Sequence, residues 1–269
     1  MEKGDNETQM ETDLTPEVNF GLAAQDYARW RQGFPDSLFA RLEDFRIGNK
    51  GQKILDIGTG TGLLGRGFAK RGCLVTGLDA SAELIEQARI LDKSEGLSTE
   101  YHLARAENSG LENASYDVVA AATCWHWFDR PKVAKECLRL LKHDGRLLIA
   151  HLDWLNLPGN AIDITLKTIR QFKTSGATKP ITFQYPDWLT ELIDAGFDSY
   201  EIFGCSTIQD YTQEAWRGRI RASRLVRPEM DAETLKNFDE ALEQTLAKNF
   251  PDFMLKVDQR IFVIVLWRR

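Results

Sequence analysis

The sequence predicts an α/β fold in which a mostly parallel sheet of seven strands is flanked by helices. Two observations support this prediction. An apolar run of strand length, Ile54–Ile57, leads through the glycine-rich turn Gly58–Gly62 into a helical pattern. Strand and helix patterns then alternate as far as His151, which is typical of parallel strands joined by right-handed crossovers. A glycine turn between a buried strand and a helix is typical of nucleotide-binding domains, because free helix N–H groups point at the ligand.

Apolar periodicity places the elements in order along the chain. Ser81 is expected to cap the helix that follows it, and Asp36 to cap an earlier helix after Pro35. Pro131 suits the first turn of a later helix, which the turn His143–Gly145 is expected to close. The predicted strands are 53–57, 73–78, 99–104, 116–122, 146–151, 200–206 and 260–267. The predicted helices are 36–45, 61–71, 82–93, 131–142, 162–172, 186–195 and a helical stretch over 214–250 that is broken at Pro228.

Residues 19–269 are expected to form one domain. Residues 1–18 are acidic and polar, which predicts a disordered tail rather than a targeting signal. The aromatic-rich segment 19–50 is expected to fold over the site as an N-terminal lid. The alternation of strand and helix breaks at 152–180 and again at 207–258. We expect these two segments to be helical insertions that cover the carboxyl end of the sheet and the substrate.

The composition argues against several classes of protein. The net charge of −6 and the pI of about 5.4 argue against general binding to nucleic acids or anionic membranes. The four cysteines are scattered without a Cys-x-x-Cys pair, so neither a zinc site nor a disulfide framework is expected. No apolar run approaches the roughly 18 residues of a membrane span. We therefore expect a cytoplasmic monomer or homodimer with a small-molecule substrate and without metal, membrane or nucleic-acid partners.

The glycine turn fits two nucleotide motifs in two registers. Gly60, Gly62 and Gly65 match Gly-x-Gly-x-x-Gly, the dinucleotide fingerprint, and Asp79 stands where a ribose-binding acid is expected. This register predicts an NAD enzyme. A short-chain dehydrogenase would also need Tyr-x-x-x-Lys, however, and no tyrosine of the chain has a lysine four residues on. Read from Asp56 instead, the turn is Asp-x-Gly-x-Gly-x-Gly.

This second register is similar to motif I of the class I S-adenosylmethionine (SAM) dependent methyltransferases. Leu78–Ser81 resembles the second motif of that family, and Arg105–Glu107 followed by Ala114–Val119 resembles the segment that lines the adenine. Cys124–Asp129 resembles the His-Trp-Phe signature of a subgroup that includes trans-aconitate-type and ubiquinone-biosynthesis-type methyltransferases, and Tyr27–Pro35 resembles its N-terminal element. The resemblance covers about residues 25–152 and implies a Rossmann-like fold.

The resemblance also implies which residues bind SAM and its product S-adenosylhomocysteine (SAH). Gly58 and Gly60 would contact the cofactor, and Asp56 would order the backbone near its amino group. Asp79 would accept hydrogen bonds from both ribose hydroxyls, because a carboxylate offers two acceptor oxygens. The other expected contacts are Ala80 beside Asp79, Ala106 and Glu107 near the adenine, Thr123 at the end of its strand, and Tyr27 and Arg31 in the lid.

Histidines and tryptophans at the ends of two predicted strands are candidates for the acceptor pocket. Trp125 and His126 follow strand 116–122, and His151 and Trp154 stand at the end of strand 146–151. His126 is the candidate catalytic base. The alternative is a histidine that only packs and orders its loop. The basic run 217–227 is either a solvated face or a clamp for an anionic substrate.

The expected function is transfer of a methyl group from SAM to a small-molecule acceptor, with a carboxylate or a hydroxyl among the candidates. The sulfonium is a good leaving group, so the protein contributes mainly alignment for in-line displacement and exclusion of water. The alternatives are a methyltransferase acting on RNA or protein, a SAM-binding protein without transfer activity and, less expected, an NAD-dependent oxidoreductase.

Overall fold

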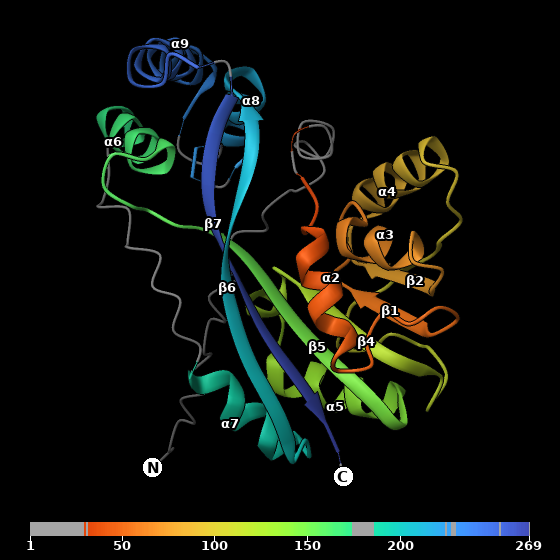
Figure 1. The fold of residues 1–269 in the computed structure, drawn as a ribbon. Coiled ribbons are helices and arrows are strands. Elements are labelled where there is room, and N and C mark those ends of the chain that lie inside the picture. Colours follow the sequence, from red (N-terminus) through yellow and green to blue (C-terminus); the bar gives the residue numbers. More distant parts are fainter. Residues whose placement is uncertain are drawn as a thin grey trace, which may run out of the picture.

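A single sheet organises the described part of the chain (Figure 1). The computed structural model describes residue 30 and residues 32–173, 186–223, 225–226, 230–252 and 254–268. Within these residues the strand order is β3-β2-β1-β4-β5-β7-β6. Neighbouring strands are parallel, except that β7 is antiparallel to both β5 and β6, so the predicted mostly parallel sheet is confirmed. The strands are β1 (Lys53–Ile57), β2 (Leu74–Asp79), β3 (Glu100–Leu103), β4 (Tyr116–Ala122), β5 (Leu141–Trp154), β6 (Ser199–Thr212) and β7 (Met254–Trp267).

Helices join most of these strands. Of the two residues predicted to cap a helix, Ser81 does so and Asp36 does not. Ser81 caps its helix as predicted, because its Oγ accepts a hydrogen bond from Leu84 N at 3.2 Å. The prediction for Asp36 is wrong. Pro35 holds the cap position, and the Asp36 carboxylate pairs instead with Arg71 Nη2 at 2.5 Å. The helices are α2 (Asp36–Glu43), α3 (Leu63–Ala69), α4 (Ala82–Ser94), the 3₁₀ turn η2 (Trp125–Trp127), α5 (Arg130–Leu140), α6 (Ala161–Phe172), α7 (Pro186–Ala195), α8 (Gln213–Arg221) and α9 (Ala232–Asn249).

Two apolar clusters hold helices against the two faces of the sheet. On one face, α2 and α3 pack buried side chains that include Leu38 and Phe68. On the other face, α5 and α7 pack side chains that include Val133 and Trp188. The central strand β4 is buried between them, with its Val118–Ala121 segment fully covered, as expected for a strand that has helices on both faces. The carboxyl ends of the parallel strands therefore form one fixed edge.

A third cluster lies beyond that edge and is built from segments far apart in the sequence. Helices α6, α8 and α9 pack around the ends of β6 and β7 through buried residues that include Trp216, Phe238 and Leu255. We call these three helices with strand residues 207–212 and 254–258 the helical subdomain; it surrounds the upper ends of β6 and β7 in Figure 1. The two segments predicted as insertions thus meet here, while their covering of a substrate stays a prediction.

Three strands are longer than the sequence patterns predicted. The antiparallel ladder of β6 and β7 runs without a break from the pair Ser199–Trp267 to the pair Thr212–Met254. The predicted strands 200–206 and 260–267 stopped where both strands leave the main core and polar residues become frequent. Strand β5 begins at Leu141, and its pairing with β4 shifts between Tyr116 and Val118. The turn His143–Gly145 therefore lies within an irregular part of β5, and α5 ends earlier, at Leu140.

Candidate cofactor and acceptor site

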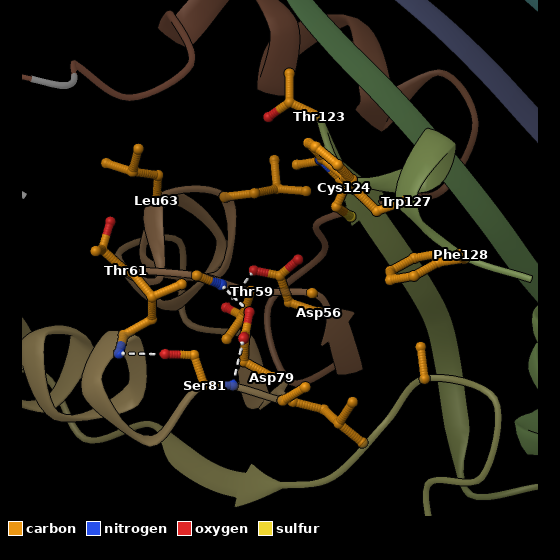
Figure 2. A pocket seen from close by; sticks show the side chains of 18 of the residues that line it. Asp56, Thr59, Thr61, Leu63, Asp79, Ser81, Thr123, Cys124, Trp127 and Phe128 are labelled. Carbon is orange, nitrogen blue, oxygen red and sulfur yellow. Dashed lines mark hydrogen bonds between the residues drawn. The ribbon is translucent and has the colours of Figure 1, made fainter. Parts of the chain in front are cut away.

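A cavity of about 710 Å³ lies at the carboxyl ends of β1, β2 and β4 (Figure 2). Figure 2 shows Asp79 and Ser81 on one side of this cavity and Thr123, Cys124 and Trp127 on the other. Its volume is within the range of small-molecule sites, roughly 300–1,000 Å³. Every predicted cofactor residue that the structure describes lines it, namely Asp56, Gly58, Gly60, Asp79, Ala80, Ala106, Glu107 and Thr123.

Asp56 is a buried acid that organises the glycine turn. Its side chain is 1% exposed, and its Oδ2 accepts hydrogen bonds from Thr59 Oγ1 at 2.7 Å and Gly65 N at 3.1 Å. Within the described residues, its Oδ1 has no hydrogen-bond partner. Burial raises the pKa of Asp56 to about 6, although the bonds from Thr59 and Gly65 oppose the shift. Desolvation dominates because the interior stabilises a carboxylate less than water does.

The turn itself requires glycine at two positions for different reasons. Gly58 has φ of +60°, and a Cβ there would lie 2.9 Å from both Cys124 Sγ and Phe128 Cζ. Gly60 has φ of +57°, but a Cβ there would meet no protein atom within 4 Å. Both conformations are in the left-handed region that favours glycine. Gly58 thus lets the loop after β4 approach, while Gly60 leaves space in the cavity.

Asp79 ends β2 and joins the glycine turn to the start of α4. Its Oδ2 accepts a hydrogen bond from Gly60 N at 2.7 Å, and its Oδ1 accepts one from Ser81 N at 2.9 Å. Burial raises the pKa of Asp79, while these backbone bonds oppose that shift. Each carboxylate oxygen has two acceptor sites, so both oxygens keep capacity for a ligand hydroxyl on the cavity side.

The loops after β3 and β4 close the cavity and are joined to each other. Glu107 Oε1 accepts a hydrogen bond from Asp129 N at 3.1 Å, and its Oε2 lies 3.4 Å from Arg105 Nε. Thr123 follows β4 with φ of +56°, an uncommon backbone conformation for a β-branched residue. Its N–H donates to Ala150 O at 2.8 Å. Backbone strain of this kind concentrates at functional sites.

A buried ion pair supports the glycine turn from behind, and no sequence motif indicated it. Arg66 Nη1 lies 2.5 Å from Asp92 Oδ1, and both side chains are almost fully buried. Arg66 Nη2 also donates to Thr61 O at 2.6 Å, and Tyr101 Oη donates to Asp92 Oδ2 at 2.8 Å. These bonds fix the end of the turn to α4.

The four residues predicted for the acceptor pocket lie outside the lining of the described cavity. Trp125 is fully buried and packs edge-on against Phe128, with 6.0 Å between ring centroids. The turn η2 directs Trp127 into the cavity wall instead. His126 is exposed, and its ring lies 5.7 Å from that of the buried His151. Trp154 contacts the helical subdomain, with its ring 5.0 Å from Trp216.

Part of the predicted lid lies at the cavity, and part lies outside the described residues. Tyr27 and Arg31 are not among the described residues, so their predicted roles remain predictions. Gln32 and Phe34, which sequence reasoning did not select, line the cavity. Cys124, Trp127 and Phe128 were also missed as lining residues, although the His-Trp-Phe motif contains two of them.

Comparisons with known proteins agree with this geometry. Residues 55–149 match the family described as "Methyltransferase domain". An uncharacterized methyltransferase of Mycobacterium bovis is 31% identical over 131 residues, which are 48% of this chain and 50% of that one. A ubiquinone biosynthesis O-methyltransferase of Xanthomonas axonopodis is 28% identical over 184 residues, 66% of this chain and 73% of that one. Residues 55–149 thus form a methyltransferase domain of the class I SAM-dependent type.

The fold of this methyltransferase domain recurs in a solved structure from Anaeromyxobacter dehalogenans, provisionally named a type II methyltransferase. Its TM-score is 0.62 at 21% identity, and the match covers 88% of this chain and 97% of that one. By sequence, the chain spans about half the length of the first curated relatives it matches. SAM is the methyl donor typical of the family, which favours the register that begins at Asp56.

The methyltransferase family match covers the part of the molecule that lines most of the cavity, and it ends before the helical subdomain. It includes β1 to β4 and most of β5, and thus most of the cavity lining. Among the described residues, no helix has the length and apolar character needed to cross a membrane. In the same residues, no three His, Cys, Asp or Glu side chains are grouped to hold a metal ion.

Proposed function

We propose that this protein transfers a methyl group from SAM to a small-molecule acceptor. The observation that carries the proposal is the convergence of Asp56, the glycine turn and Asp79 on one cavity at the carboxyl edge of the sheet. The similarity to the ubiquinone biosynthesis O-methyltransferase of Xanthomonas, which is named for the synthesis of a small molecule, supports this acceptor class. The cytoplasmic location and the monomeric or dimeric state expected from the sequence stay predictions.

Several residues of the cavity support the proposal that SAM binds there. Asp79 offers two carboxylate oxygens to a ribose diol, and backbone amides from both neighbouring loops already fix its orientation. Gly60 leaves open space at the turn. Ala106 is buried in the wall and Glu107 lies beside it, where they would flank the adenine. Asp56 would hold the turn in shape through Thr59 and Gly65 rather than by direct contact.

Bound SAM would supply an electrophilic methyl group on a sulfonium. The chain's own contribution is to align the acceptor with that methyl group and to exclude water. Thr123 and Trp127 lie on the wall opposite Asp79 (Figure 2). Phe34 and Phe128 add apolar surface to the same cavity. This wall would desolvate the reacting groups, which strengthens their electrostatic interactions.

His126 is the candidate to remove a proton from a hydroxyl or amine acceptor. Its ring lies 5.0 Å from that of Trp127, which lines the cavity, and 5.7 Å from that of His151. His151 in turn packs 5.2 Å from Trp188 of α7. The two imidazoles therefore stand side by side just beyond the wall, an arrangement that suits proton transfer to solvent through the exposed His126.

The proposal is tested by calorimetry with SAH. Replacing Asp79 with alanine removes the charged acceptor of the diol, a loss of about 1.5–3 kcal/mol or about 10- to 150-fold in affinity. Glu86→Ala is the matched control, because Glu86 is an exposed acid of α4 that does not line the cavity. Equal SAH affinities for the two variants would show that the cofactor site is elsewhere. Tritium transfer from labelled SAM into a metabolite extract then separates an enzyme from a protein that only binds SAM.

A further inference from the structure

Charged pairs help to make the helical subdomain one packed unit. Arg217 Nη2 lies 2.6 Å from Asp239 Oδ2, and Arg221 Nη1 lies 2.6 Å from Asp239 Oδ1, so two members of the basic run join α8 to α9. Neither arginine lines the described cavity. Arg224 and Arg227 lie outside the described residues. The two paired arginines therefore stabilise the subdomain rather than bind a substrate.

A buried amide on β6 reaches from this subdomain to the cavity wall. Gln209 is 8% exposed, and Tyr211, two residues later on the same face of the strand, belongs to the subdomain core. The Tyr211 hydroxyl donates to Gln209 Oε1 at 3.5 Å. Gln209 Nε2 donates in turn to Gly33 O at 2.8 Å. The subdomain core thus orients the amide so that its N–H faces the segment before α2.

That segment is part of the cavity wall. Gln32 and Phe34, on either side of Gly33, line the cavity, and we call these three residues the wall segment. A Cβ built on Gly33 would lie 4.0 Å from the backbone oxygen of Leu63, which begins α3 and also lines the cavity. Gln32 Nε2 donates to Asp210 O at 2.7 Å. Two side-chain amide bonds therefore fix the wall segment to β6.

These two hydrogen bonds differ in how they relate to the cavity. Gln32 is exposed and lines the cavity, so replacing it changes the cavity surface and the bond together. Gln209 does not line the cavity, and the structure joins it to the wall only through Gly33 O. A buried amide without a partner is costly, so this bond favours the position in which Gly33 lies beside β6.

We propose that Gln209 is a positioning residue for SAM binding, because it holds the wall segment over the cofactor cavity from the helical subdomain. This proposal rests on the proposed function and deepens it, since it places part of the SAM site outside the cavity lining. Without the bond to Gly33 O, the wall segment leaves its place in a larger fraction of the molecules. The apparent affinity for SAM then falls with the fraction that keeps the wall in place.

Calorimetric titration with SAH tests the proposal. Gln209→Leu has a side chain of similar size without a donor for Gly33 O, and it should weaken SAH binding by about 3- to 10-fold, the factor that one neutral hydrogen bond contributes to an equilibrium. Gln213→Leu is the matched control. Gln213 Nε2 also donates to a backbone carbonyl, Phe250 O, at 2.8 Å, but Gln213 does not line the cavity or contact its wall. This control should leave SAH affinity unchanged.

Amide hydrogen exchange separates positioning from a general loss of stability. A peptide covering residues 32–39 should exchange faster in Gln209→Leu than in the wild type or in Gln213→Leu, because the wall segment is released. Gln209→Asn keeps the amide on a side chain that is one methylene too short to reach Gly33 O. It should reproduce both effects, and it serves as the test if Gln209→Leu does not fold.

Three results would overturn the role of Gln209. These are an SAH affinity equal to that of the wild type, an equal loss of affinity in Gln213→Leu, or weaker SAH binding with unchanged exchange at residues 32–39. SAH binding by the wild type is measured first. Its absence would overturn the proposed function itself, whereas wild-type binding that both Gln209 variants retain would refute only the positioning role.

Discussion

Replacing Asp56 with asparagine is expected to flatten the pH dependence of stability between about pH 4 and pH 7.5. The pKa of Asp56 rises from its ordinary value of 3.8 to about 6 in the folded protein, mainly because burial removes water. The folded state therefore binds its proton more tightly than the unfolded state does. Between these two pKa values the folded state holds more protons, so stability falls as pH rises through this window.

The size of this effect follows from the two pKa values. A shift of about two units corresponds to about 3 kcal/mol over the whole titration. Between about pH 5 and pH 7.5, the wild type loses about 1.5 kcal/mol of this contribution to its stability. An asparagine does not titrate, and its side-chain oxygen can still accept the hydrogen bonds from Thr59 and Gly65. From about pH 5 to pH 7.5, the free energy of unfolding of the variant should therefore rise by about 1.5 kcal/mol relative to that of the wild type.

Urea unfolding at several pH values measures this double difference directly. The constant cost of the substitution cancels, because only the change with pH is compared. Glu86→Gln, which alters an exposed acid of α4, controls for general charge effects. A difference below about 0.5 kcal/mol between the two pH values would mean that Asp56 titrates near its ordinary pKa. The argument from burial would then be wrong.

Two further substitutions test the turn and the candidate base. Gly58→Ala should cost about 1–2 kcal/mol of stability, because the alanine must adopt a positive φ. Its Cβ would also contact Cys124, which should displace the loop after β4 and weaken SAH binding. An unchanged SAH affinity would contradict this reasoning. His126→Asn should lower kcat by about 100-fold or more while leaving SAH affinity unchanged. An unaltered pH–rate profile would leave His126 a packing residue only.

The cofactor half of the fold could be predicted because its signals are local. Strand β1 and the turn after it are adjacent in sequence, and Asp56 is joined to Thr59 and Gly65 within nine residues. Asp79 follows from the end of β2, since parallel strands bring their carboxyl ends to one edge. A motif that spans one strand and one turn therefore contains most of the geometry of its own site.

The loop after β4 and the helical subdomain could not be predicted in the same way. Within the turn η2, the sequence does not show which tryptophan enters the core, and the structure buries Trp125 while Trp127 lines the cavity. The lengths of β6 and β7 depend on the helical subdomain that packs on their ends. Their polar outer residues made the strand pattern end early. Long-range packing, rather than local propensity, decided both cases.

Residues 32–35, which precede α2, connect the cavity wall to the helical subdomain. Gln32 donates to Asp210 O across 178 residues of sequence, and Gln209 Nε2 donates to Gly33 O at 2.8 Å across 176. Each of the two side-chain amides thus binds the backbone next to the other. The same segment lines the cavity through Gln32 and Phe34. The helical subdomain therefore fixes one wall of the cofactor cavity. We therefore expect a movement of the subdomain to move that wall as well, and SAM binding to change with it.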